Sequence, residues 1–150
     1  MNKLIFATHN PNKVKEVREL LSDSFEILGL NDIGFNEDII EDKLTIMENS
    51  IKKAEFVKTK TGYDCFADDT GLEVDALNGR PGVFSKRFAG PNSSSDDNIN
   101  KLLEMLRNNT NRAARFKTVI SLSKNGQIIT FEGTCEGNIA RERTGNLGFG

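Results

Sequence analysis

The sequence lacks both a cluster of basic residues and a long apolar run. Its 20 Lys and Arg residues are outnumbered by 22 Asp and Glu, giving a net charge of −2 at pH 7, and no run of Lys or Arg exceeds two residues. We therefore expect no broad basic face for nucleic acid. No stretch approaches the roughly 18 apolar residues that span a bilayer, and the N-terminal apolar run is too short for a signal peptide. These absences predict a cytoplasmic protein that binds neither nucleic acid nor membrane.

Cysteine and histidine are also scarce. Cys65 and Cys135 stand alone in the sequence and His9 is its single histidine, which argues against a zinc site and provides no disulfide framework. The length of 150 residues is common for one domain and allows one sizeable core. No internal repeat or low-complexity linker divides the chain, so the sequence predicts a single domain over residues 1–150.

Short apolar runs alternate with amphipathic segments, which predicts an α/β fold with a mixed sheet. Strands are expected over residues 4–7, 25–30, 65–67, 72–77, 114–123 and 127–135, the last two joined by an Asn-Gly hairpin. Helices are expected after Asn10, after Thr45 and around residues 99–106. The buried faces of the first two helices are predicted to carry Val14, Val17, Leu20 and Leu21, and Met47, Ile51, Ala54 and Val57. Residues 68–71 are expected to form a turn, and residues 31–43 a polar loop.

The junction between the first strand and the first helix is rich in polar side chains. The sequence THNPNK, Thr8 to Lys13, lies where a helix N-terminus offers N–H groups and a partial positive charge. Lys13 adds a full positive charge in the first turn. Such a junction suits a phosphate group, although the Walker A spacing is absent. The alternative is an ordinary capped turn with a solvated lysine and with His9 facing solvent.

Two consecutive carboxylates, Asp68 and Asp69, follow the short strand that begins at Cys65. Because neighbouring strand residues point to opposite faces, only one of them is expected to face a shared site. An acidic segment upstream contains Glu37, Asp38, Glu41 and Asp42. Carboxylates beside a phosphate site are the ligands that Mg²⁺ requires. An aspartate-rich turn is the alternative.

Lysines on the second predicted helix add positive charge to this region. Lys52 and Lys53 are neighbours, about 100° apart around a helix, so only one of them can face a substrate. Glu48 is more simply explained as part of a capping box with Thr45 than as a metal ligand.

Four segments together resemble the inosine triphosphate pyrophosphatase family, which hydrolyses non-standard purine nucleoside triphosphates. They are FATHNPNKVKEVRELL, EDKLTIMENSIKKA, FADDTGLEVDALNGRPGVFSKRFAG and GNLGFG, and they occur in the order and spacing of the family. The chain departs from the family's pattern at Lys43, where the family has Gly, and at Ile46, where it has Phe. The resemblance implies an elongated mixed sheet flanked by helices, with two lobes around a nucleotide cleft, and a homodimer.

The resemblance also implies which residues hold the substrate and its cation. For the phosphates it implies Thr8, His9, Asn10, Pro11, Asn12, Lys13 and Lys53, with Asp68 nearby. For the rest of the substrate it implies Thr70, Phe149 and Gly150. It implies that Glu41 and Asp69 bind Mg²⁺ and that Asp69 is the catalytic residue.

The implied reaction converts ITP, dITP or XTP to the monophosphate and pyrophosphate, which would remove deaminated purines from the nucleotide pool. A related pyrophosphatase for other modified nucleotides and a non-catalytic nucleotide-binding module are the alternatives. The family continues after Gly150 with a Tyr-Asp pair, a Lys and a Ser-His-Arg segment that recognises the purine. We therefore expect this chain to be truncated at its C-terminus.

Overall fold

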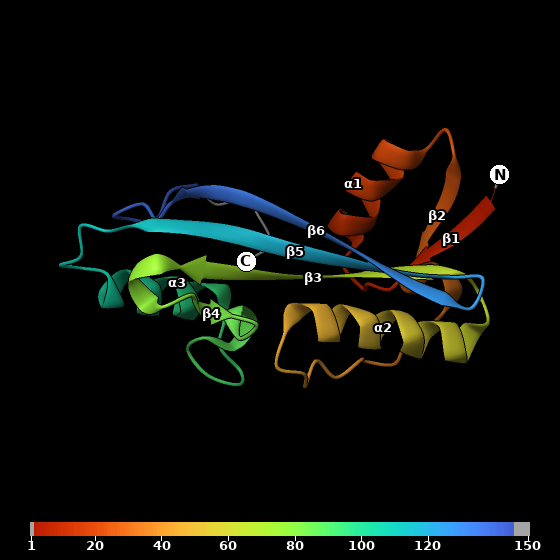
Figure 1. Ribbon diagram of the computed structural model, residues 1–150, viewed down its shortest axis with the longest axis horizontal. Coiled ribbons are helices and arrows are strands. Elements are labelled where there is room, and N and C mark those ends of the chain that lie inside the picture. Colours follow the sequence, from red (N-terminus) through yellow and green to blue (C-terminus); the bar gives the residue numbers. More distant parts are fainter. Residues whose placement is uncertain (1, 146–150) are drawn as a thin grey trace. The chain divides into compact units, whose positions relative to one another are not determined.

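The computed structural model describes residues 2–145 and shows a mixed α/β fold (Figure 1). Its helices are α1 (Pro11–Leu21), α2 (Ile46–Thr61) and α3 (Ser95–Met105), with short 3₁₀ turns η1 (Asn31–Ile33), η2 (Asp75–Leu77) and η3 (Ser85–Arg87). Its strands are β1 (Asn2–Phe6), β2 (Phe25–Gly29), β3 (Cys65–Val74), β4 (Arg80–Gly82), β5 (Ala113–Lys124) and β6 (Gln127–Asn138). The predicted fold class, a mixed sheet flanked by helices, is confirmed.

The described strands form a sheet in the order β2-β1-β3-β5-β6, and β4 pairs with β3 outside this path. β1 pairs in parallel with both β2 and β3, whereas β4 is antiparallel to β3. The chain divides into two compact units. The first contains the described residues up to Asp69 together with Val119–Glu132, and the second contains Thr70–Thr118 together with the described residues from Gly133 onward.

Two apolar layers cover the two faces of the sheet in the first unit. Alternate residues of β1 point to opposite faces, so Leu4 and Phe6 pack with Val14 of α1, while Ile5 packs with Val57 of α2. α1 and α2 accordingly lie on opposite sides of β1 and β3 (Figure 1). β3 continues the same alternation, with Phe66 on the α1 side and Ala67 on the α2 side.

Both helices of the first unit begin at the expected caps. The Asn10 side chain caps α1, and Thr45 caps α2 by accepting from the backbone N–H of Glu48. α2 ends at Gly62, whose φ of 75° is the left-handed conformation that glycine adopts without strain. Among the described residues, no helix is both long and apolar enough to cross a membrane.

The predicted turn at residues 68–71 is wrong, because β3 runs without interruption from Cys65 to Val74. Asp and Gly favour turns when the local sequence decides. Here tertiary pairing decides instead, since β3 is hydrogen-bonded to β5 and its residues Leu72, Glu73 and Val74 also pair with β4. Gly71 is needed for this close approach, because a Cβ atom there would lie 2.5 Å from the carbonyl oxygen of Gly82.

Two predictions about buried helix faces are also wrong. Leu20 of α1 is exposed, as is Met47 of α2. The buried residues of α2 are Ile46, Asn49, Ser50, Lys53, Ala54 and Val57, so the N-terminal half of its buried face is mostly polar. The spacing of apolar residues could not reveal this face, because several of its buried residues are polar and form hydrogen bonds.

The second unit is built around α3, where Leu102 of the helix and Leu106 at its C-cap pack with Val74, Leu77 and Ala114. α3 begins at a complete capping box, in which Ser94 and Asp97 accept from each other's backbone N–H groups.

Arg112 connects the end of α3 to the segment after β6. Its buried guanidinium donates to the carbonyl oxygens of Leu106 at 2.9 Å, Ile139 at 2.7 Å and Ala140 at 2.8 Å. Its positive charge also interacts favourably with the negative end of the helix dipole of α3.

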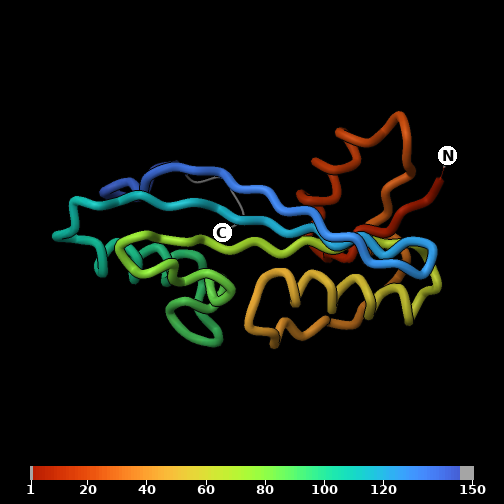
Figure 2. The backbone as a smooth tube through the Cα atoms, in the orientation of Figure 1, coloured from red at the N-terminus to blue at the C-terminus, as the bar shows by residue number. Residues whose placement is uncertain are grey.

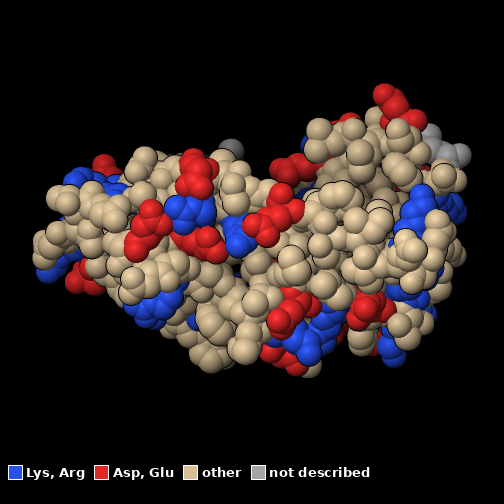
Figure 3. All heavy atoms as spheres, viewed as in Figure 1, with Lys and Arg blue, Asp and Glu red and all other residues tan. Residues whose placement is uncertain are grey.

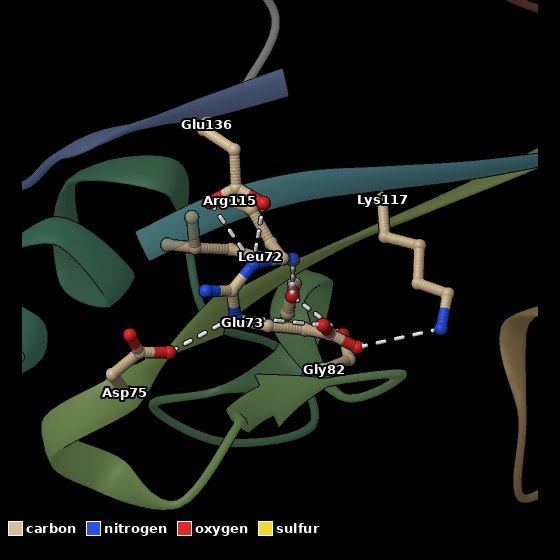
Figure 4. Close-up of polar contacts among 8 residues, drawn as sticks. Leu72, Glu73, Asp75, Gly82, Arg115, Lys117 and Glu136 are labelled. Carbon is tan, nitrogen blue, oxygen red and sulfur yellow. Dashed lines mark hydrogen bonds and ion pairs between the residues drawn. The ribbon is translucent and has the colours of Figure 1, made fainter. Parts of the chain in front are cut away.

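Arg115 joins three strands of the second unit (Figure 4). Its guanidinium lies 3.0 Å from Asp75 Oδ1, 2.9 Å from Glu136 Oε1 and 3.9 Å from Glu73 Oε1, while Lys117 lies 3.9 Å from Glu73 Oε2. The hydrogen bond to Asp75, followed by that to Glu136, raises the pKa of Arg115 above its ordinary value. These charges pair with one another, so we interpret the cluster as a structural link between strands.

We predict that Arg112→Met lowers the free energy of unfolding by about 2–4 kcal/mol, because several buried carbonyl groups lose their donor. Urea denaturation at pH 7 measures this change. Arg107→Met is the matched control, since the Arg107 side chain is 70% exposed and should contribute less than about 0.5 kcal/mol. Equal effects of the two substitutions would contradict the assigned role of Arg112.

Candidate active site

The candidate site lies where β1 ends. β1 is the central partner of β2 and β3, and the connections through α1 and α2 cover opposite faces of the sheet. Open α/β sheets bind ligands at such a switch point, beside the carboxyl ends of the strands. The pairing of β1 with β3 ends at Phe6 and Phe66, whereas β3 continues onward (Figure 2). Asp68 and Asp69 therefore lie beyond the carboxyl end of β1.

The chain itself uses the N–H groups of the first turn of α1. Asn10 Oδ1 accepts from the backbone N–H groups of Asn12 at 3.0 Å and Lys13 at 3.3 Å, and Thr8 Oγ1 accepts from that of Asn10 at 3.1 Å. Pro11, at the first helical position, has no N–H group. This junction therefore offers an incoming anion mainly the side chain of Lys13 and the dipole of the helix.

Lys13 connects this junction to β3. Its ammonium nitrogen lies 2.8 Å from Asp68 Oδ2, and the side chains of Lys13 and Asp68 are 26% and 11% exposed. The other oxygen, Asp68 Oδ1, is buried and accepts no hydrogen bond. A buried carboxylate oxygen without a donor is costly, so Asp68 has unused capacity for a hydrogen bond or a cation.

Lys53 approaches the same stretch of β3 from α2. It is buried, donates to the backbone carbonyl of Asp68, and lies 3.2 Å from Glu41 Oε1. As predicted, its neighbour Lys52 points elsewhere, to Asp42 Oδ1 at 2.7 Å. Asp68 is thus held by two lysines, one through its carboxylate and one through its backbone.

The alternation along β3 places the two aspartates on opposite faces. Phe66 packs with Val14 on the α1 face and Ala67 packs with Ala54 on the α2 face. Asp68 follows Phe66 and contacts Lys13, whereas Asp69 follows Ala67 and belongs to the α2 face. Asp69 is half-buried and its Oδ2 atom is fully buried. Glu41, Lys53 and Asp69 therefore belong to one face of β3.

Residues 36–44, which we call the acidic loop, bring Glu41 to this face. Three lysines of α2 pair with its carboxylates: Lys53 with Glu41, Lys52 with Asp42, and Lys60 with Glu37 at 3.7 Å. These contacts fix a segment that has neither helix nor strand of its own.

Asn49 holds the acidic loop directly and Asn31 does so through His9, and sequence reasoning missed both. Asn49 Oδ1 accepts from the backbone N–H of Lys43 at 2.9 Å, and Asn31 Oδ1 lies 3.0 Å from His9 Nδ1. The spacing of Asn49 and Lys53, four residues apart on one helix, could have revealed a polar buried face.

The structure brings part of the predicted site together. Thr8, Asn10, Lys13, Glu41, Lys53, Asp68 and Asp69 all belong to the first unit. Thr70 belongs to the second unit, where its hydroxyl lies 2.7 Å from that of Thr118. Phe149 and Gly150 lie outside the described residues. Figure 3 shows acidic and basic side chains interspersed on the face in view.

Comparison with known proteins identifies the family. The sequence profile of the Ham1 family matches residues 4–150. The chain belongs to the Ham1 family. It is 54% identical over 148 residues to the dITP/XTP pyrophosphatase of Flavobacterium johnsoniae, covering 99% of this chain and 77% of that protein. It is 50% identical over 151 residues to the dITP/XTP pyrophosphatase of Porphyromonas gingivalis, covering 100% and 78%.

Solved structures of Ham1 proteins share the fold. A HAM1 protein from Coxiella burnetii superposes with a TM-score of 0.89 at 38% identity, covering 99% of this chain and 78% of that one. The Ham1 protein of Staphylococcus aureus gives a TM-score of 0.86 at 38% identity, covering 99% and 77%. The resemblance inferred from the four sequence segments is thereby confirmed.

We predict that Asp68→Asn lowers the free energy of unfolding by about 1–2 kcal/mol at pH 7, because Lys13 loses a largely buried countercharge. Asp96→Asn is the control: Asp96 pairs with Arg143 at 2.6 Å, but both side chains are about half exposed or more, at 66% and 49%. Such a surface pair should contribute less than about 0.5 kcal/mol. Urea denaturation compares the two variants, and an unchanged midpoint in Asp68→Asn would refute the stabilising role of its pair with Lys13.

Proposed function

We propose that this Ham1-family protein hydrolyses dITP, ITP and XTP to the monophosphate and pyrophosphate. The observation that carries the proposal is the convergence of Lys13, Lys53, Glu41, Asp68 and Asp69 at the carboxyl end of β1. The 54% identity to a protein named dITP/XTP pyrophosphatase supports the choice of substrate. Removal of deaminated purines from the nucleotide pool is the role we propose for this activity.

We also propose Mg²⁺ as the cofactor, held by Glu41 and Asp69. No group of three or more His, Cys, Asp or Glu suited to a metal occurs within residues 2–145. Mg²⁺ does not require one, because it commonly binds one or two carboxylates together with water and substrate phosphates. Glu41 and Asp69, the two carboxylates that we assign to the α2 face of β3, fit that donor set. When bound, Mg²⁺ would supply charge neutralisation for the phosphate oxygens.

The two lysines would orient the triphosphate and compensate its charge. Lys13 and Lys53 approach β3 from opposite faces, so together they can contact phosphate oxygens on both sides of the strand end. As the bond between the α-phosphorus and the bridging oxygen breaks, negative charge grows on the leaving pyrophosphate. Fixed ammonium groups stabilise this charge with little reorganisation.

Asp69 would act as the general base. Its carboxylate takes a proton from the attacking water as the water oxygen bonds to the α-phosphorus, and pyrophosphate leaves with the electrons of the broken bond. The α2 face, where we place Asp69, also contains Lys53 and Glu41, so base and charge compensation lie together.

We further propose that the protein is cytoplasmic and works as a homodimer. The sequence predicts the first, and the resemblance implies the second. The homodimer is also compatible with the exposed apolar side chains Ile120, Ile129 and Phe131 on the β5–β6 hairpin, since surfaces of this kind are often covered by protein partners.

We predict that Asp69→Asn lowers kcat for dITP by about 100-fold or more with little change in folding. The amide keeps the shape and hydrogen-bonding capacity of the carboxylate but can neither accept the proton nor bind a hard cation well. Pyrophosphate release at saturating Mg²⁺ gives kcat, and nucleotide titration gives the affinity, which should be retained because both lysines remain.

Asp68→Asn is the matched control, since it removes the same charge one residue away on the opposite face. It frees Lys13 from its partner and should change KM more than kcat. Near-normal kcat in Asp69→Asn, or a larger loss of kcat in Asp68→Asn, would reverse the roles of the two carboxylates.

We predict that light scattering at micromolar concentration gives the mass of a homodimer. The measurement needs a reducing buffer and the Cys135→Ser variant, because Cys135 is an exposed free thiol that could create a disulfide-linked dimer. A monomer mass under these conditions would argue against the homodimer.

A further inference from the structure

His9 lies at the β1–α1 junction, and both of its ring nitrogens contact a distant segment. Nδ1 is 3.0 Å from Asn31 Oδ1, and Nε2 is 3.0 Å from the backbone oxygen of Glu37 in the acidic loop. The ring also lies near Phe35, with a centroid separation of 6.5 Å. A single side chain thus spans the junction, η1 and the acidic loop.

The orientation of the Asn31 amide is fixed by a third contact. Its nitrogen, Nδ2, donates to the backbone carbonyl of His9 at 3.2 Å, so its oxygen must face the ring. The Glu37 contact is a carbonyl oxygen and can only accept. Both ring nitrogens therefore face acceptors.

Only the protonated imidazolium carries a hydrogen on each nitrogen and can satisfy both acceptors at once. In either neutral tautomer, one nitrogen presents a lone pair to an oxygen, which repels it. Deprotonation must therefore break or weaken one of the two contacts. The hydrogen bond that weakens is either the one to Asn31 or the one to Glu37 in the acidic loop.

The charged groups around the ring favour the proton. Asp38 in the acidic loop attracts it directly, whereas the Glu37 carboxylate pairs with Lys60 of α2 and the Asp32 carboxylate of η1 pairs with Arg18 of α1. The hydrogen bond to Asn31, and then that to Glu37, raise the pKa of His9 above its ordinary value of 6.5, while burial opposes them.

We propose that His9 is a positioning residue whose protonated ring fastens the acidic loop to the phosphate-binding junction. We call the two contacts of the protonated ring, with Asn31 and with Glu37, the latch. Glu41 is in the same loop, four residues after Glu37, so the latch helps to place this carboxylate opposite Lys53. The consequence for catalysis rests on the proposed function, whereas the latch itself rests on the contacts of the ring. The sequence suggested only a solvent-facing or phosphate-contacting histidine.

The direction of the pH effect follows from the raised pKa. A histidine with a higher pKa in the folded chain stabilises the fold at pH values below its unfolded value of 6.5. That contribution disappears as the pH rises through the folded pKa. The latch is therefore closed in mildly acidic solution and loosens toward alkaline pH.

Nuclear magnetic resonance can test the latch directly, because His9 is the single histidine of the chain and gives one set of ring signals. The ring should titrate with a pKa above 6.5. The methyl signal of Ile39 in the acidic loop should shift with the same midpoint. The methyl signal of Ile27, which is buried in the sheet, is the control and should not follow that midpoint.

Three variants test the contacts of the His9 ring, and each has a different expected result. Asn31→Ala removes an acceptor and should lower the pKa of His9, whereas Asn31→Asp replaces it with a carboxylate and should raise the pKa further. His9→Gln has no proton to lose near neutral pH, so the Ile39 signal should no longer titrate there. A ring pKa that does not respond to Asn31, or an Ile39 signal that titrates unchanged in His9→Gln, would overturn the proposal.

Hydrolysis measured over the same pH range separates the two proposals. If the latch assists catalysis, KM for dITP rises through the pKa of His9, and this step is absent in His9→Gln. A ring and loop that titrate together in a protein without pyrophosphatase activity would uphold the latch and refute the proposed function. Pyrophosphatase activity in a protein whose Ile39 signal does not follow the titration of His9 would uphold the proposed function and refute the latch.

Discussion

The candidate site depends on the unequal lengths of β1 and β3. β1 stops at Phe6, and β3 continues past it as one strand to Val74, so the backbone and side chain of Asp68 have no β1 neighbour. This gap allows Lys13 to reach the carboxylate from one helix and Lys53 to reach the carbonyl from the other. A longer β1 would close the gap, and a turn at residues 68–71 would remove both aspartates from the strand. The lysine contacts and the placement of both aspartates follow from this single mismatch.

The amphipathic pattern predicted the fold class because most elements obey it. Leu4, Phe6 and Val14 pack as their spacing requires, and the caps at Asn10 and Thr45 lie where expected. The failures share one cause: tertiary partners outweighed local preference. The turn-forming residues after Ala67 belong to a strand that pairs with β5 and, further on, with β4. The N-terminal half of the buried α2 face is mostly polar, although the apolar residues of α2 predicted a core.

The candidate site could be predicted as a set of residues but not as a set of contacts. The motifs around Lys13, Glu41, Lys53 and Asp69 indicated phosphate and cation chemistry. The sequence could not show that Asn10 uses the N–H groups of the first helical turn, because capping and anion binding need the same residue types. Nor could it show the role of Asn31, which is 22 residues from His9 and meets it only through the fold.

The lysines of the candidate site are already neutralised before any nucleotide arrives. Lys13 is paired with Asp68 and Lys53 with Glu41, and Asp69 brings the charges of these five side chains to a net −1. Without Mg²⁺, a triphosphate approaching these five side chains meets no net positive charge, unlike substrates steered by a positive cleft. Capture becomes an exchange of counter-ions, in which phosphate oxygens displace carboxylates from the two ammonium groups.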